Sequence, residues 1–260
     1  MSIWGKILGG AAGFAVGGPI GALLGGIAGH AVDSMRSDLK RVRGAGEQAG
    51  DDPGGFHAEM PGSESTRQVA FTVGVIVLGA KIAKVDGKVT PDEVRAFKQV
   101  FHVPPEEEKN VGRLFNLARR DARGFEPYAR QLGRLFRDQP AVLERLLDAL
   151  FHIARADGEV TGPELDYLEQ VARLFNLDRP TWERIKAANI DEADNPYKIL
   201  GVKPDASDEE IKSRHRSLVR EHHPDRLIAQ GMPEEMVQVA NEQLARINSA
   251  YDEIRKLRGS

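Results

Sequence analysis

Apolar residues recur every three or four positions along most of the chain, a spacing that places them on one face of an α-helix. Strict alternation of apolar and polar residues, which is typical of a half-buried strand, is scarce. We therefore expect an all-α protein. The periodic segments and the gaps between them divide the chain into four parts: 1–33, a linker at 34–66, a helical domain at 67–190, and a second helical domain at 195–258.

The last part contains two amphipathic runs that predict a helical hairpin. Their apolar faces hold Ile211, His215, Leu218 and His222 in the first run, and Met236, Ala240, Leu244, Ile247, Tyr251 and Ile254 in the second. Ser207 followed by Glu210 is a capping-box sequence at the start of the first helix. Pro224 disfavours a helical His223, so this helix should end near His222. Residues 223–232 then form the tip of the hairpin, with His223 and Asp225 exposed on a stiff bend.

The first part is a glycine-rich stretch that is long enough to cross a membrane. Residues 7–29 carry no formal charge, and about 20 apolar residues span a bilayer as a helix. Glycines recur at every fourth position, which allows two such helices to approach closely: Gly5, Gly9, Gly13, Gly17, Gly21, Gly25 and Gly29. We expect a glycine-zipper transmembrane helix in membrane lipid, and a homodimer formed through Gly9, Gly13, Gly17, Gly21 and Gly25.

Two other interpretations of this stretch stay open. One is a signal peptide, although the apolar region is long and no small-residue cleavage site is evident. The other is a glycine hairpin that turns at Gly18-Pro19, with halves too short to span. For a single span, the flanking charges predict the topology, because one lysine precedes it and four basic residues follow: Lys6, and Arg36, Lys40, Arg41 and Arg43. The positive-inside rule then places the C-terminal domains in the cytoplasm, at a bacterial inner membrane.

The middle part contains an internal repeat. The apolar run 69–80 is only a dozen residues long, so it predicts a buried core helix rather than a second span. Residues 82–93 then match residues 153–164, and each copy holds a helix end, an Asp-Gly turn and a capping box. Thr90 pairs with Glu93 in the first copy, and Thr161 with Glu164 in the second. Each copy predicts a helix-turn-helix unit.

The acidic residues of the repeat allow two interpretations: Asp86, Asp92, Glu93, Asp157 and Glu164. They could form a metal or acidic interaction site, or they could serve only as turn and capping residues. The Asp-x-Asp-x-Asp-Gly spacing of a calcium loop is absent, which favours turn chemistry, so we expect no metal site.

Composition excludes several classes of protein. The chain has no cysteine, so disulfides and thiolate metal sites are excluded. Net charge is −3, with 20 basic and 21 acidic residues in 67–194 and 11 of each in 195–260. This balance argues against a nucleic-acid surface. No nucleophile–base arrangement indicates an enzyme, and nothing indicates a cofactor.

Positive charge is concentrated on the helix before the predicted bend. Lys212, Arg216 and Arg220 are four residues apart and share one face, which could be a solvated surface or could steer an acidic partner. His-Pro-Asp alone would be a polar loop. Metal ligation by His222, His223 and Asp225 is disfavoured, because adjacent rings point apart and no fourth ligand follows.

In its context the triplet resembles part of a J domain, the module with which DnaJ-type co-chaperones stimulate a DnaK-type ATPase. The sequence NPYKILGV at 195–202 precedes the Ser207 helix, His223-Pro224-Asp225 follows that helix, and Ala250-Tyr251 lies in the return helix. The resemblance implies that His223, Pro224 and Asp225 engage the DnaK-type partner near its interdomain linker, beside the basic face of Lys212, Arg216 and Arg220. It also implies that Asp225 meets a partner arginine.

This sequence departs from the usual J-domain pattern at two positions. His215 stands where an aromatic residue, most often tyrosine, is usual, and Ser217 stands where a basic residue is usual. Both lie on or beside the docking helix, so affinity or partner choice could differ, and His215 brings possible pH sensitivity.

The repeat is similar to the TerB-like helical domain. A membrane span, a TerB-like domain and a J domain in this order resemble the DjlA family of membrane-anchored co-chaperones. We therefore expect a co-chaperone that does no chemistry itself and biases its DnaK-type partner toward hydrolysis. The alternative is a metal-responsive TerB-like scaffold at the membrane that uses the J domain only as a recruiting module.

Overall fold

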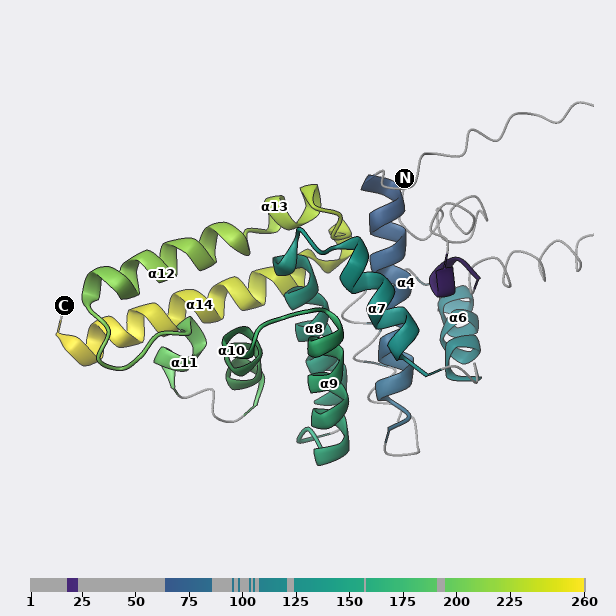
Figure 1. Ribbon diagram of the computed structural model, residues 1–260, viewed down its shortest axis with the longest axis horizontal. Coiled ribbons are helices and arrows are strands. Elements are labelled where there is room, and N and C mark those ends of the chain that lie inside the picture. Colours follow the sequence, from purple (N-terminus) through teal and green to yellow (C-terminus); the bar gives the residue numbers. More distant parts are fainter. Residues whose placement is uncertain are drawn as a thin grey trace, which may run out of the picture.

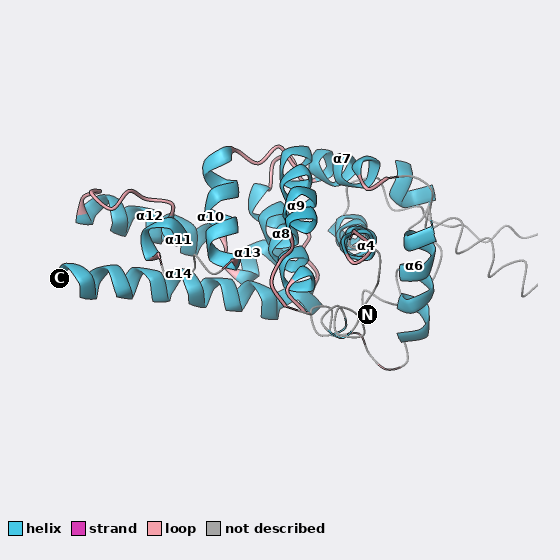
Figure 2. Ribbon diagram, turned by 90° about the horizontal axis from the view of Figure 1, so that it is seen from below, coloured by secondary structure: helices cyan, strands magenta, loops and turns pink. Residues whose placement is uncertain are grey.

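The computed structural model describes residues 18–22, 64–85, 108–120, 124–156, 158–190 and 195–259, together with the single positions Arg95, Lys98, Val103 and Pro105. These residues form helices and connecting loops, and no strand occurs among them (Figures 1 and 2). This confirms the all-α prediction for the part of the chain that the structure describes.

The middle domain is a bundle of helices around one large hydrophobic core. Its helices are α4 (Glu64–Ile82), α6 (Glu108–Arg120), α7 (Glu126–Leu135), α8 (Pro140–Ala154), α9 (Gly162–Leu174) and α10 (Arg179–Asn189). Helix α4 contains the apolar run 69–80, which is buried as expected, and α4 packs on α6, α7 and α8. It begins at Glu64, inside the stretch that we expected to be linker.

Helix α9 begins with the capping box that the second repeat predicts. Thr161 Oγ1 accepts a hydrogen bond from the Glu164 backbone N–H, and the Thr161 N–H donates to Glu164 Oε2 at 2.8 Å. Thr90, Glu93 and the other repeat residues Asp86, Asp92 and Asp157 lie outside the described residues.

The C-terminal domain contains α11 (Pro196–Leu200), α12 (Asp208–Glu221), α13 (Pro224–Ala229), the 3₁₀ turn η2 (Glu234–Met236) and α14 (Val237–Arg258). Helix α12 is capped by Ser207 and ends at Glu221, with His222 as its C-cap. Helices α12 and α14 pack together as the predicted hairpin (Figure 1). The short helix α13 was not predicted. It forms because Pro224 suits the first position of a helix, and it ends before Gly231, whose φ is +105°.

Helix α14 belongs to two hydrophobic cores. Its N-cap Met236 and Ala240 in its first turn lie in the large core of the middle domain. Its later turns contribute Ile247, Ala250 and Ile254 to a smaller core with α11 and α12. Ala188 of α10 also lies in the smaller core, so the two domains share their packing. In Figure 1, α14 runs from beside α8 out to the C-terminus.

The predicted membrane segment lies almost entirely outside the described residues. Only Gly18–Ala22 are described, as a short helical segment in which Ile20 is buried and its N–H donates to Gln131 Oε1 at 3.0 Å. Gly18 has a φ of +59°, at the point where the alternative glycine hairpin would turn. Within the residues that the structure describes, no helix is both long enough and apolar enough to cross a membrane.

Candidate partner-docking site

The His-Pro-Asp triplet forms a tight turn between α12 and α13. His223 is the N-cap of α13, and its Nδ1 accepts a hydrogen bond from the Asp225 backbone N–H at 3.3 Å. The Pro224 side chain is buried, whereas the side chains of His223 and Asp225 are 51% and 89% exposed. The turn therefore presents an imidazole and a carboxylate to solvent from a backbone that proline and a capping bond hold in place.

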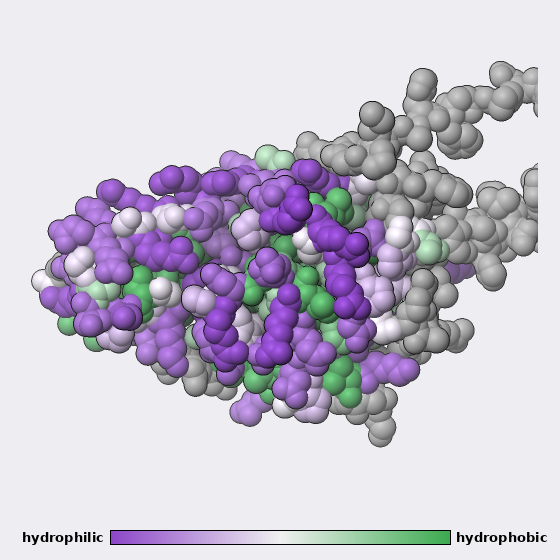
Figure 3. Space-filling model, in the orientation of Figure 1, coloured by the Kyte–Doolittle hydropathy of each residue, from purple (hydrophilic) through white to green (hydrophobic). Residues whose placement is uncertain are grey.

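Basic side chains of α12 and α13 surround the exposed pair. Arg216 and Arg220 lie with His223, Asp225 and Arg226 around an open hollow of about 450 Å³, which is also lined by His215 and Val219. Hydrophilic side chains dominate the surface over α12 and α13 in the view of Figure 3. The hollow thus carries three arginines and one carboxylate, and it favours an acidic partner that also offers a cation to Asp225.

Lys212 is exposed on the same helix, α12, but lies nearer its N-terminal end, away from the His-Pro-Asp turn. It lines a second hollow, toward the start of α12 and the end of α14, with Asp208, Glu209 and Arg255 among its neighbours. The structure therefore brings Arg216 and Arg220 to the His-Pro-Asp turn. Lys212 lies more than two helical turns before the end of α12 that leads into this turn.

The unusual His215 fills the place of an aromatic residue in the hairpin. Its ring stacks on Tyr251 of α14, with centroids 4.1 Å apart and planes 8° apart, and Nε2 lies 2.9 Å from Asn248 Oδ1. Ser217 donates a hydrogen bond to Glu221 Oε1 at 2.7 Å, within α12. Both departures are therefore accommodated inside the hairpin, and His215 supplies a flat contact between α12 and α14.

The residues on both sides of the exposed pair are anchored in the middle domain. Leu227, Met232 and Met236, which follow the triplet, are fully buried in the large core. A side chain at Gly231 would meet Arg67 Cβ at 2.8 Å and Phe136 at 3.3 Å, so this loop lies directly on α4 and the end of α7. His222, which precedes the triplet, has no exposed surface.

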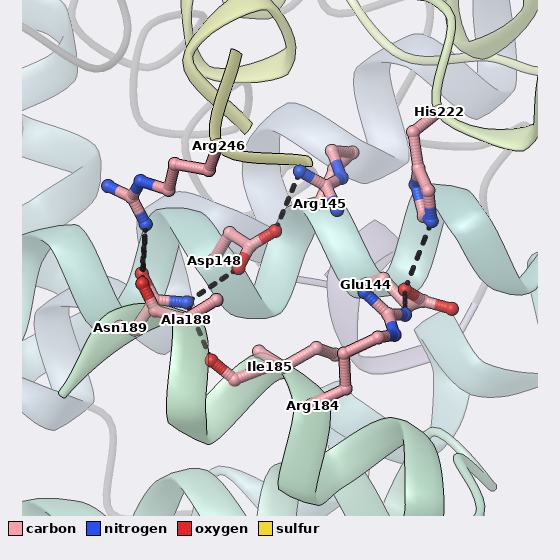
Figure 4. Close-up of polar contacts among 9 residues, drawn as sticks. All are labelled: Glu144, Arg145, Asp148, Arg184, Ile185, Ala188, Asn189, His222 and Arg246. Atoms are coloured by element: carbon pink, nitrogen blue, oxygen red, sulfur yellow. Dashed lines mark hydrogen bonds and ion pairs between the residues drawn. The ribbon is translucent and has the colours of Figure 1, made fainter. Parts of the chain in front are cut away.

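The His222 ring ends in a buried polar cluster that links three helices (Figure 4). Its Nε2 lies 3.4 Å from Glu144 Oε2, on α8. The same carboxylate oxygen accepts a hydrogen bond from Arg184 of α10, in a buried ion pair. Arg184 also packs against the C-terminal domain, because a Cβ at Gly201 would come within 3.3 Å of its Cδ. One arginine therefore contacts the Leu-Gly-Val segment and the carboxylate beside His222.

A second branch of the cluster ties α8 and α10 to α14. Arg145 Nη1 lies 2.8 Å from Asp148 Oδ2, and Asp148 Oδ1 accepts a hydrogen bond from Asn189 Nδ2 at 2.7 Å. Arg246 of α14 donates to Asn189 Oδ1 at 3.1 Å and to the Ala188 carbonyl at 3.0 Å. These contacts are shown in Figure 4. They join the two domains at a second point, farther from the triplet.

Burial determines the charge state of His222. Removal from water lowers the pKa of its imidazole well below the ordinary value, and the nearby cations Arg145, Arg184 and Arg214 lower that pKa further. The ring is therefore neutral at neutral pH and carries a single N–H, for which Glu144 is the nearby acceptor. Burial likewise lowers the pKa of Arg145, against the opposing effect of Asp148 and Glu144, yet a guanidinium stays charged.

Reasoning from the sequence did not identify this cluster. Helix α8 is buried almost all round, and Glu144, Arg145 and Asp148 interrupt an otherwise apolar helix. Charged residues are rarely buried unless they are paired, so their presence in such a run was the signal that could have been used. Its partners Arg184 and His222 are distant in sequence, and only the packing of α8, α10 and α12 reveals them.

No metal site is evident in the described part of the chain, where no group of three or more histidine, aspartate or glutamate side chains could hold an ion. Glu164 of the second repeat is engaged in its capping box. The remaining acidic residues of the repeat are not among the described residues, so the metal interpretation rests on no geometry.

Three family models match successive parts of the chain. They are described as the co-chaperone DjlA transmembrane domain, over residues 1–47, tellurite resistance protein TerB, over 72–187, and the DnaJ domain, over 195–256. The chain is therefore a J-domain protein, and its DnaJ domain implies a DnaK-type chaperone as partner.

Curated relatives extend this likeness over the full length. Co-chaperone protein DjlA of Photobacterium profundum is 29% identical over 284 aligned positions, which cover 99% of both chains. Co-chaperone protein DjlA of Coxiella burnetii is also 29% identical, again over 99% of both chains, and that of Vibrio parahaemolyticus is 29% identical over 82% of this chain and 86% of its own. No solved structure matches the chain significantly. With the three domains in this order, the chain is similar over its whole length to the DjlA co-chaperones, and the match of its first domain suggests a membrane-anchored protein.

Proposed function

We propose that this protein stimulates the ATPase of a DnaK-type chaperone through its His-Pro-Asp turn and the basic face of α12. The observation that carries the proposal is the hollow in which His223 and Asp225 lie exposed beside Arg216 and Arg220, on a hairpin that matches the DnaJ domain. In this proposal Asp225 binds a partner arginine, and the arginines of α12 attract an acidic surface around it. Pro224 acts by stiffening the turn, and Lys212 extends the basic face along the helix.

The protein's part in the reaction is to bias a partner, not to transform a substrate. A co-chaperone of this kind shifts its partner toward the hydrolysis-competent state only if it binds that state more tightly. The relatives are named co-chaperones, and nothing in their names indicates a catalytic activity of their own. The metal-responsive scaffold is not favoured, because the relatives that match over the full length are named co-chaperones and the C-terminal domain matches the DnaJ domain.

We further propose the cellular arrangement that the N-terminal domain supports. The uncharged stretch 7–29 anchors the protein in the bacterial inner membrane, the domains from residue 67 onward lie in the cytoplasm, and two copies associate through the face of Gly9, Gly13, Gly17, Gly21 and Gly25. In this arrangement the His-Pro-Asp turn would act on DnaK-type molecules near the membrane surface.

Binding to the partner tests the basic face directly. We expect the double variant Arg216→Glu and Arg220→Glu to weaken ATP-state binding of a DnaK-type chaperone by about tenfold or more, because like charges would now face its acidic surface. Binding of the full-length protein should be measured by biolayer interferometry at two salt concentrations. The matched control Arg173→Glu reverses an exposed arginine of α9, on the middle domain. Equal affinity of the double variant and the control would contradict docking through α12.

A further inference from the structure

The His-Pro-Asp turn is held on the middle domain from both sides. His222 lies immediately before the triplet and is fully buried, and Leu227 and Met232 lie after it and are buried in the core of the middle domain. Between His222 and Leu227, the side chains of His223, Asp225 and Arg226 are exposed and that of Pro224 is buried. The position of the exposed pair therefore depends on residues outside the J domain.

The anchor before the triplet is polar and specific. The Glu144 carboxylate, from α8, lies between the His222 ring and the Arg184 guanidinium. Arg184 fixes that carboxylate, and its own stem is fixed against Gly201. Because His222 and His223 share a peptide bond, a shift of the buried ring that displaces its backbone would change the direction in which the exposed ring points. Hydrophobic contacts alone would tolerate such a shift. Here the hydrogen bond from Arg184 holds the Glu144 carboxylate, and that carboxylate lies 3.4 Å from His222 Nε2.

We propose that Glu144 and Arg184 of the TerB-like domain are positioning residues for the His-Pro-Asp turn, and that they act through His222. The TerB-like domain would thereby determine how well the J domain engages its partner, although it does not touch that partner through these residues. This proposal rests on the proposed function, since it concerns the turn that would stimulate the DnaK-type ATPase.

Two isosteric variants test the proposal on the full-length protein. Glu144→Gln keeps the size of the side chain but removes its charge, and His222→Phe keeps a buried ring but removes its nitrogens. Each should raise the concentration that gives half-maximal stimulation of the DnaK-type ATPase by about fivefold, a typical effect of residues that couple sites indirectly. The double variant should be no worse than either single variant, because both interrupt the same link.

Glu169→Gln is the matched control. It makes the same substitution on α9, where Glu169 pairs with Arg173 and Arg179 at the surface, and it should leave the half-maximal concentration unchanged.

A spectroscopic measurement reads the turn without the partner. In protein labelled at the histidine ring carbons, Glu144→Gln and His222→Phe should shift the ring resonance of His223, and Glu169→Gln should not. Unshifted His223 signals in both variants, or unchanged half-maximal concentrations, would overturn the proposal. If the wild-type protein failed to stimulate the ATPase, the proposed function would be wrong, while the resonances would still show whether Glu144 positions the turn. Should Glu144→Gln fail to fold, His222→Phe alone decides the matter by the same two measurements.

Discussion

At the scale of single residues, the two histidines between α12 and α13, one buried and one exposed, have opposite roles. His223 presents its ring to solvent beside Asp225, while His222 is enclosed by α8, α10 and α12. The sequence predicts both positions, because His222 lies on the apolar face with Ile211 and Leu218, and Pro224 ends the helix directly afterwards. It does not predict what His222 meets there. Glu144 and Arg184 belong to α8 and α10, and the sequence does not show that these two helices pack beside His222.

The buried ring makes the stability of the fold depend on pH. The pKa of His222 is lowered in the folded protein, whereas an unfolded histidine has a pKa of about 6.5. As the pH falls below that value the unfolded chain takes up a proton that the folded chain resists, so stability is lost on acidification and is fully present above it. The groups that face the ring are Glu144 and Arg145 of α8, Arg184 of α10 and Arg214 of α12.

We therefore expect wild-type protein to lose stability relative to His222→Phe as the pH falls from 7 to 5, by at most about 1.4 kcal/mol per pH unit. The measurement is urea unfolding followed by circular dichroism at a series of pH values. His152, whose pKa burial also lowers, is present in both proteins, so the difference between them isolates His222. If the free energies of unfolding of the two proteins changed with pH in parallel, the pKa of His222 would not be lowered in the folded state, and the prediction would be wrong.

At the scale of helices, the periodic pattern predicts the elements well where they are long. The core helix at 69–80, the capped helix from Ser207 and the long C-terminal helix all form, and α12 ends where Pro224 requires. The short α13 escapes prediction, because six residues hold too few apolar positions to show a period. In α8 the pattern alone cannot tell that the charged positions Glu144, Arg145 and Asp148 are buried.

Both the sequence pattern and the matching family model support a membrane-spanning helix near the N-terminus. We expect the full-length protein to stay in the membrane fraction after an alkaline wash, because residues 7–29 are uncharged and long enough to span. A chain that begins at residue 34 is the control and should be released. Recovery of the full-length protein in the soluble fraction would contradict a membrane span.

At the scale of the whole molecule, the two helical domains behave as one packed unit in the described residues. Helix α14 contributes to both cores, and α10 contributes Ala188 to the smaller core. The sequence indicates two domains, since the repeat and the J-domain motifs are separate. It does not indicate their contact, because Met236 and Ala240 continue the same apolar stripe as Ile247 and Ile254. Which stretch of that stripe faces which domain depends on three-dimensional packing alone.

The joint packing explains how one short turn can be presented firmly at the surface. The core of the middle domain holds the residues after the triplet, and the Glu144–Arg184 pair holds the residue before it. A membrane-anchored co-chaperone built in this way would offer its partner a rigid site rather than a loosely tethered module.

The most direct test of the proposed function is the rate at which a DnaK-type chaperone hydrolyses bound ATP in a single turnover. Full-length protein should accelerate that turnover. His223→Gln should abolish the acceleration with an unchanged circular dichroism spectrum, because His223 is an exposed side chain whose loss leaves the core intact. Stimulation by the variant that equals that of the wild type would contradict a mechanism through the His-Pro-Asp turn.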